Sequence, residues 1–87
     1  MRAAVWNRIE DAPFDEGTTQ TLLDIRKLVV DETVSMNPAF DYDGLDEEVA
    51  RALLDLACYG ERHREHLTRY ARSRANRFVF VKASGWR

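Results

Sequence analysis

The first strong apolar pattern lies in residues 19–36, where Leu22, Ile25 and Val29 recur at the spacing of one helical face. Leu23, Val30 and Val34 lie beside this stripe. The pattern predicts an amphipathic helix with a broad apolar face. Thr18 or Thr19 is the expected N-terminal cap, because a threonine hydroxyl can accept a hydrogen bond from a free N–H of the first turn.

A second apolar pattern starts near Asp46 and repeats about every seven residues, as expected for one face of a helix. Its members are Val49, Leu53, Leu56, Gly60, His63, Leu67 and Tyr70. Further apolar residues surround the first half, which we therefore expect to be the most buried element. The helix could continue to about Ala75 or break at Gly60, where glycine costs about 1 kcal/mol relative to alanine. We favour one continuous helix.

The ends of the chain carry patterns that favour strands. Residues 2–9 alternate weakly between apolar and polar positions. Residues 77–82 are rich in Phe and Val, the residue types that strands prefer, and Asn76 could close the preceding helix in a left-handed conformation. The expected fold is α+β and mainly α, with residues 1–87 forming a single domain.

The predicted C-terminal strand is apolar on both faces, with Phe78 and Phe80 on one face and Val79 and Val81 on the other. A chain of 87 residues has little left to cover the second face, and a sheet of two strands is marginal in water. We therefore expect a homodimer whose interface includes Phe78 and Phe80. Coverage of both faces within one monomer is the alternative.

The composition, 45% hydrophobic and 32% charged, is typical of a globular protein. No apolar run approaches the ~20 residues that span a bilayer, and the N-terminus lacks the apolar segment of a signal peptide. Cys58 is the only cysteine, so no internal disulfide can form. These observations favour a cytoplasmic protein.

Charge is distributed unevenly along the chain. Residues 1–61 contain 14 acids and 5 bases, whereas residues 62–87 contain 1 acid and 8 bases, for a total net charge of −2. The basic third could bind an acidic partner. Alternatively, the two parts could face each other within one fold.

A basic surface is predicted on the second half of the long helix. Arg62, His66 and Arg69 share one face, Arg72 flanks it, and Arg77 follows the helix. We expect these residues to bind an acidic surface of a protein partner, as in a small regulator or a phage-type inhibitor. The alternative is a nucleic-acid-binding protein that uses the same arginines on phosphates, but the negative net charge disfavours it.

The sequence provides little evidence for catalysis or for a bound metal. It has no glycine-rich phosphate loop and no nucleophile elbow, and Cys58 is expected to be buried and inert. His63 and His66 are three residues apart and could share one metal ion, but two ligands leave a zinc site incomplete. On a continuous helix Cys58 would lie opposite His63. We therefore predict no enzyme activity, cofactor or metal site.

Overall fold

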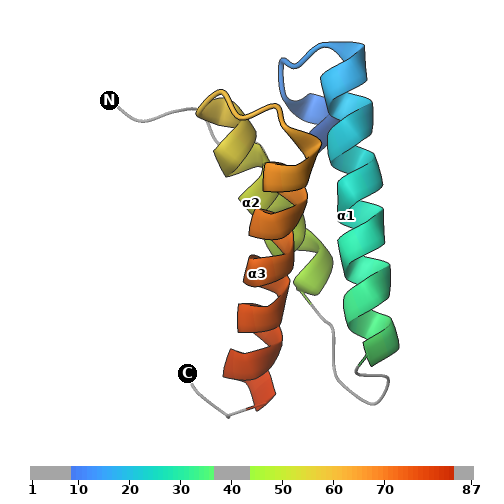
Figure 1. Cartoon of the computed structure of the whole chain (residues 1–87), viewed down its shortest axis with the longest axis vertical. Coiled ribbons are helices and arrows are strands. Elements are labelled where there is room, and N and C mark those ends of the chain that lie inside the picture. Colours follow the sequence, from blue (N-terminus) through green and yellow to red (C-terminus); the bar gives the residue numbers. More distant parts are fainter. Residues whose placement is uncertain (1–8, 37–43, 84–87) are drawn as a thin grey trace.

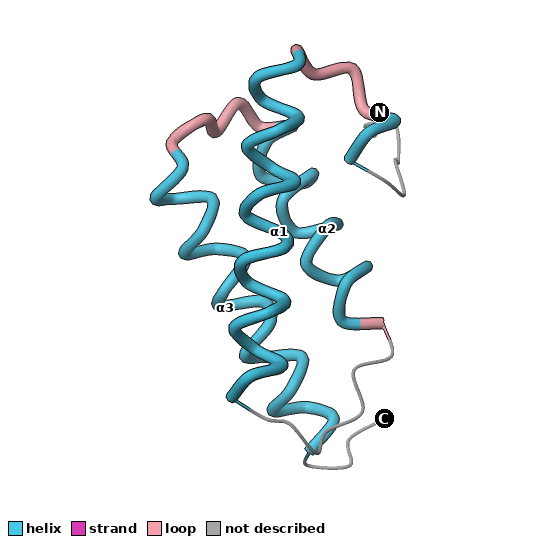
Figure 2. The backbone as a smooth tube through the Cα atoms, turned by 90° about the vertical axis from the view of Figure 1, so that its right-hand side faces the viewer, coloured by secondary structure: helices cyan, strands magenta, loops and turns pink. Residues whose placement is uncertain are grey.

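The computed structural model describes residues 9–36 and 44–83, which form a bundle of α-helices (Figure 1). The elements follow in the order η1 (Ile9–Asp11), α1 (Glu16–Met36), α2 (Leu45–Cys58) and α3 (Arg64–Ala83). The described residues contain helices and loops and no β-strand (Figure 2). The α+β prediction is therefore wrong, and the described part of the chain is all-α.

Helix α1 begins three residues earlier than the sequence pattern indicated. The Oδ1 atom of Asp15 accepts a hydrogen bond from the backbone N–H of Thr18 at 3.1 Å, so Asp15 is the N-terminal cap. Thr18 is thus a donor in the first turn and not the cap. The predicted stripe is confirmed, because Leu22, Ile25 and Val29 are fully buried.

Helix α2 supplies the largest share of the core, as predicted. Its buried residues are Leu45, Val49, Ala50, Ala52, Leu53, Leu54 and Ala57. The helix starts after Gly44, which has a left-handed φ of 91° and gives no side-chain cap. Three acids in the first turn, at positions 46–48, instead lie where the helix dipole favours negative charge.

The continuous second helix is a wrong prediction, because α2 ends just before Gly60. Gly60 has a φ of +100°, a region that side-chain-bearing residues rarely adopt. Its N–H donates to the carbonyl of Ala57 at 2.9 Å, and the N–H of Glu61 donates to the carbonyl of Leu56 at 3.3 Å. This pair of bonds is the Schellman motif that terminates helices. The chain then reverses, so that α3 packs beside α2 (Figure 1).

Residues 77–82 are helical, and they continue α3 where a strand was expected. The buried residues Leu67, Ala71 and Ala75 form a stripe at helical spacing, and Phe78 extends it against the core. No described non-glycine residue has a positive φ, so Asn76 does not end the helix. Packing of this stripe outweighs the local strand preference of Phe and Val.

The argument for a homodimer rested on that strand and loses its basis. Phe78 is half-buried within the monomer, where its ring lies 3.7 Å from the position a Cβ on Gly44 would take. Phe80, by contrast, is exposed. Oligomeric state itself stays a prediction. Of the expected N-terminal strand only Ile9 falls within the described residues, and it belongs to η1.

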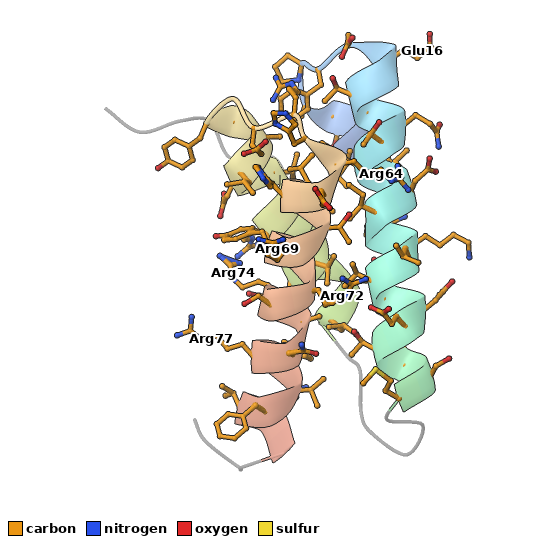
Figure 3. All side chains as sticks on the ribbon, in the orientation of Figure 1. Glu16, Arg64, Arg69, Arg72, Arg74 and Arg77 are labelled. Carbon is orange, nitrogen blue, oxygen red and sulfur yellow. The ribbon has the colours of Figure 1, made fainter. Side chains whose placement is uncertain are left out.

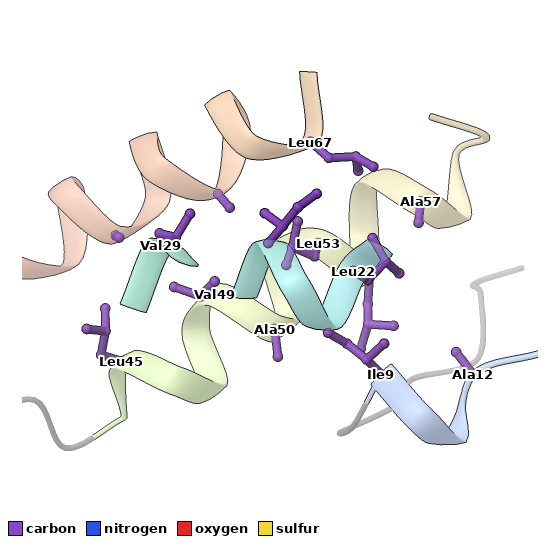
Figure 4. Packing of buried hydrophobic residues seen from close by; sticks show 14 residues of the cluster. Ile9, Ala12, Leu22, Val29, Leu45, Val49, Ala50, Leu53, Ala57 and Leu67 are labelled. Atoms are coloured by element: carbon purple, nitrogen blue, oxygen red, sulfur yellow. The ribbon is translucent and has the colours of Figure 1, made fainter. Parts of the chain in front are cut away.

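The core lies along the axis between the helices, each of which contacts the other two. Leu22 of α1, Leu53 of α2 and Leu67 of α3 are buried together there (Figure 4). Ile9 and Ala12 close one side of the cluster. Ala71 and Ala75, the buried alanines of α3, are small, which lets its backbone approach the other helices closely.

Two glycine substitutions test the helix break at Gly60. G60A should lower the free energy of unfolding by about 1–2 kcal/mol, because alanine resists a left-handed conformation even where space is open. G17A, inside α1 and free of close contacts, should raise it by about 0.5–1 kcal/mol. Urea unfolding measures both. If α2 and α3 were one helix, G60A would stabilise the protein instead.

Candidate functional site

The arginines predicted to form one binding face have separate environments in the structure. Arg72 points toward α1, where its Nε donates to Glu32 at 2.8 Å (Figure 3). Arg62 lies in the turn before α3 and donates to the carbonyls of Ala57 at 2.7 Å and Glu61 at 2.9 Å. Both arginines therefore serve the fold, and they are poorly placed to serve a partner as well.

Arg62 holds the end of α2 in a way that the sequence pattern did not reveal. The carbonyl of Ala57 is one of the last in α2, where free carbonyls and the helix dipole favour a positive charge. The guanidinium also lies over the ring of Phe14, 5.1 Å from its centroid. Arg62 thus connects the α2–α3 turn to the segment before α1.

Arg74 is a structural residue that the sequence analysis did not single out. Its guanidinium pairs with Glu48 at 3.1 Å and approaches Asp55 at 3.9 Å, both on α2. It also lies over the ring of Tyr70. Together with the Arg72–Glu32 pair, the contacts of Arg74 with Glu48 and Asp55 show that the basic helix α3 faces acids of α1 and α2. Part of the charge asymmetry is therefore neutralised within the fold.

Arg69 and Arg77 remain available at the surface. Both extend from the side of α3 that faces away from α1 (Figure 3). No ion pair or hydrogen bond joins either guanidinium to a residue that the structure describes. Of the five predicted partner-binding residues, these two are the exposed cations without a structural role.

Phe80 lies on the same side of α3 as the two free arginines. With about 100° of rotation per residue, position 80 falls between positions 69 and 77 around the helix. The side chain is 68% exposed, an unusual state for a phenylalanine. We call the exposed side of α3 its outer face, formed by Glu65, His66, Arg69, Ser73, Asn76, Arg77 and Phe80.

A cluster of titratable groups lies at the start of α3. The Oε2 atom of Glu61 accepts hydrogen bonds from the backbone N–H groups of His63 at 2.9 Å and Arg62 at 3.1 Å. The Nδ1 atoms of His63 and His66 lie 3.2 and 3.3 Å from the two carboxylate oxygens. Glu61 thereby fixes the turn and both imidazole rings.

These hydrogen bonds change the acidity of Glu61. The bond from the backbone N–H of His63 is the largest cause that lowers the pKa of Glu61 from 4.5 to about 2. Bonds from the rings of His66 and His63 act in the same direction. The carboxylate is consequently ionised across the whole neutral range. The sequence analysis missed Glu61 as a partner of both histidines, because on a continuous helix it would point away from His63.

A hollow of about 480 Å³ adjoins this cluster, between the end of α2 and the first half of α3. Its lining residues are Leu56, Glu61, His66, Arg69, Tyr70 and Ser73. Ser73 and His66 are seven residues apart on α3, which is about 10.5 Å along the axis. Ser73 is therefore too far from His66 to be activated by it as a nucleophile.

Cys58 is exposed, contrary to the expectation that it is buried. Within the described residues no helix is both long enough and apolar enough to cross a membrane.

Comparisons of the chain with protein families, with curated proteins and with solved structures found no match.

The pKa of Glu61 makes the stability of the turn dependent on pH. Because the folded-state pKa is lowered, ionised Glu61 stabilises the fold above about pH 4.5, and this contribution disappears as the pH falls toward 2. E61Q should therefore be less stable than the wild type at pH 7, and the difference should shrink in acid. Urea unfolding between pH 7 and pH 2.5 measures this.

E65Q is the matched control, since Glu65 is exposed on the first turn of α3 and contributes no bond to the Glu61 cluster. It should unfold like the wild type at every pH. If E61Q lowered the free energy of unfolding by the same amount at every pH, the result would contradict the assigned role of the carboxylate.

Proposed function

We propose that this chain is a non-enzymatic protein–protein interaction module, of the small regulator or inhibitor kind, that binds an acidic partner surface through the outer face of α3. The observation that carries the proposal is the exposed Phe80, which lies on the same side of α3 as the unpaired Arg69 and Arg77. Aromatic residues and arginine are the types most enriched in the energetically important centres of protein interfaces.

The chemistry of the outer face supports a protein partner. Phe80 offers apolar area that a partner can bury, while the two unpaired guanidinium groups can form bidentate bonds with carboxylates. The adjoining hollow of about 480 Å³ could receive a partner side chain beside Arg69. Interfaces commonly combine exposed apolar area with arginines nearby, as this side of α3 does.

The nucleic-acid alternative has weaker support. Two of the four predicted arginines, Arg62 and Arg72, already bind groups within the chain. Neutralising only two phosphates would give a salt-dependence slope of roughly −2 and little affinity at physiological salt. Acids of α2 also lie beside Arg74 and would repel a phosphate backbone.

Charge reversal on the outer face tests the proposal. R69E/R77E should weaken partner binding at least about tenfold, because loss of interface hot spots costs about 2 kcal/mol or more each. Its unfolding free energy should stay within about 0.5 kcal/mol of the wild type, since neither guanidinium bonds within the fold. The measurement is quantitative cross-linking and capture of partners from host extract.

K27E/R51E is the matched control. It changes the net charge by the same amount as R69E/R77E but places the changes on α1 and α2. Lys27 and Arg51 are exposed and belong to surface ion pairs of little energetic value. A partner lost equally in both variants responds to net charge alone, which would contradict the proposed face. Fluorescence anisotropy with labelled DNA and RNA completes the test. Nucleic-acid binding that weakens steeply with salt would replace the proposal with the alternative.

A further inference from the structure

The α2–α3 turn brings together three side chains whose donor atoms commonly bind metals. The ligating atoms of Glu61, His63 and His66 all lie within 4.8 Å of one another. The two imidazole rings face the same carboxylate, and their centroids are 5.2 Å apart. The metal-binding atoms of two imidazoles and one carboxylate thus converge. This convergence depends on the α2–α3 turn, because sequence spacing along one helix would not produce it.

The distances within this cluster suit a tetrahedral metal ion. Zinc binds nitrogen and carboxylate oxygen at about 2.0–2.2 Å, which places neighbouring ligand atoms roughly 3.3 Å apart in a tetrahedron. The separations between Glu61 oxygens and the Nδ1 atoms of His63 and His66 are 3.2 and 3.3 Å. The two separations involve different oxygens, since His63 lies near Oε2 and His66 near Oε1. One ring must therefore shift toward the shared ligand oxygen and the rings must approach each other, and both are exposed enough to turn.

The donor set also matches known zinc chemistry. Two histidines and one glutamate are a ligand set of zinc enzymes, in which the fourth position holds water or substrate. Here the side chains of His63 and His66 are 80% and 55% exposed, so a fourth ligand can reach the ion from solvent. Imidazole ligands favour zinc, copper and nickel over magnesium or calcium.

We propose that Glu61, His63 and His66 bind one divalent transition-metal ion, with Zn²⁺ as the preferred species. The Nδ1 atom of each ring, which now bonds to the carboxylate, becomes a ligand, and its proton moves to Nε2 or is released to solvent. The fourth position stays open. Metal binding would join the α2–α3 turn to the first turn of α3.

The consequence for stability follows from mass action. An ion that binds only the folded chain raises its melting temperature, by roughly 10–20 °C at a hundredfold excess over Kd for a domain of this size. The two histidines are the only ones in the chain, so their ring signals in ¹H NMR report on the site without overlap.

The test is a titration of the metal-free full chain with ZnCl₂ by calorimetry, with melting curves and ¹H NMR of the histidine rings in parallel. The expected result is one ion per chain, shifts in both ring signals and a higher melting temperature that EDTA reverses. H63Q, H66Q and E61Q should each weaken binding at least about tenfold. H63Q is the most informative variant, because this exposed side chain can be changed with little effect on packing.

E65Q and C58S are the matched controls, one a neighbouring carboxylate and the other the lone exposed thiol. Both should bind zinc like the wild type. Weakening by C58S equal to that by H63Q would overturn the assignment, as would zinc binding that is insensitive to E61Q. Absence of any heat, ring shift or melting change up to millimolar zinc would also overturn it.

Discussion

The left-handed turn at Gly60 determines the position of everything that follows it. Glycine reaches a φ of +100° without steric cost, and the Schellman bonds close the last turn of α2 around it. Arg62 then donates a second hydrogen bond to the carbonyl of Ala57, and the carboxylate of Glu61 accepts from the backbone N–H groups of Arg62 and His63, just before α3. Two consecutive residues thus bind the end of α2 and hold the short turn that leads into α3.

The turn also determines which charges are used by the fold. Because α3 reverses direction and packs beside α1 and α2, Arg72 meets Glu32, and Arg74 meets Glu48. Such partly exposed pairs contribute little energy each, but they orient the helix faces. Part of the uneven charge of the linear sequence therefore reflects a basic helix packing against two acidic ones.

Local periodicity predicted α1 and α2 well. Leu22, Ile25 and Val29 are buried as expected, and so is Leu53, because each lies within one uninterrupted helix where spacing determines the face. After Gly60 the predicted stripe is confirmed at Leu67 but not at His63 or Tyr70. Tyr70 was placed on the apolar stripe by counting through the glycine, yet it is 37% exposed, while the stripe of α3 passes through Ala71 and Ala75.

The remaining errors have related physical causes. The strand prediction for residues 77–82 relied on β-propensity. A helical series nonetheless leads into this segment, through Leu67, Ala71, Ala75 and Phe78. It was hard to recognise because alanine is only weakly apolar. Glu61 could not be recognised as a partner of both histidines, because only a broken helix brings it to them. Arg62 and Arg72 were grouped with Arg69 by helical spacing, which carries no information on where the acids of other helices lie.

The narrow buried stripe of α3 makes its exposed residues informative. Leu67, two alanines and part of Phe78 suffice to pack this helix against the bundle. The fold therefore places little demand on the opposite side, where short polar residues would serve equally well. The phenylalanine at position 80 is 68% exposed, so it contributes little to the packing of the monomer. The recognition role proposed for the outer face would account for Phe80 and for the unpaired guanidinium groups of Arg69 and Arg77.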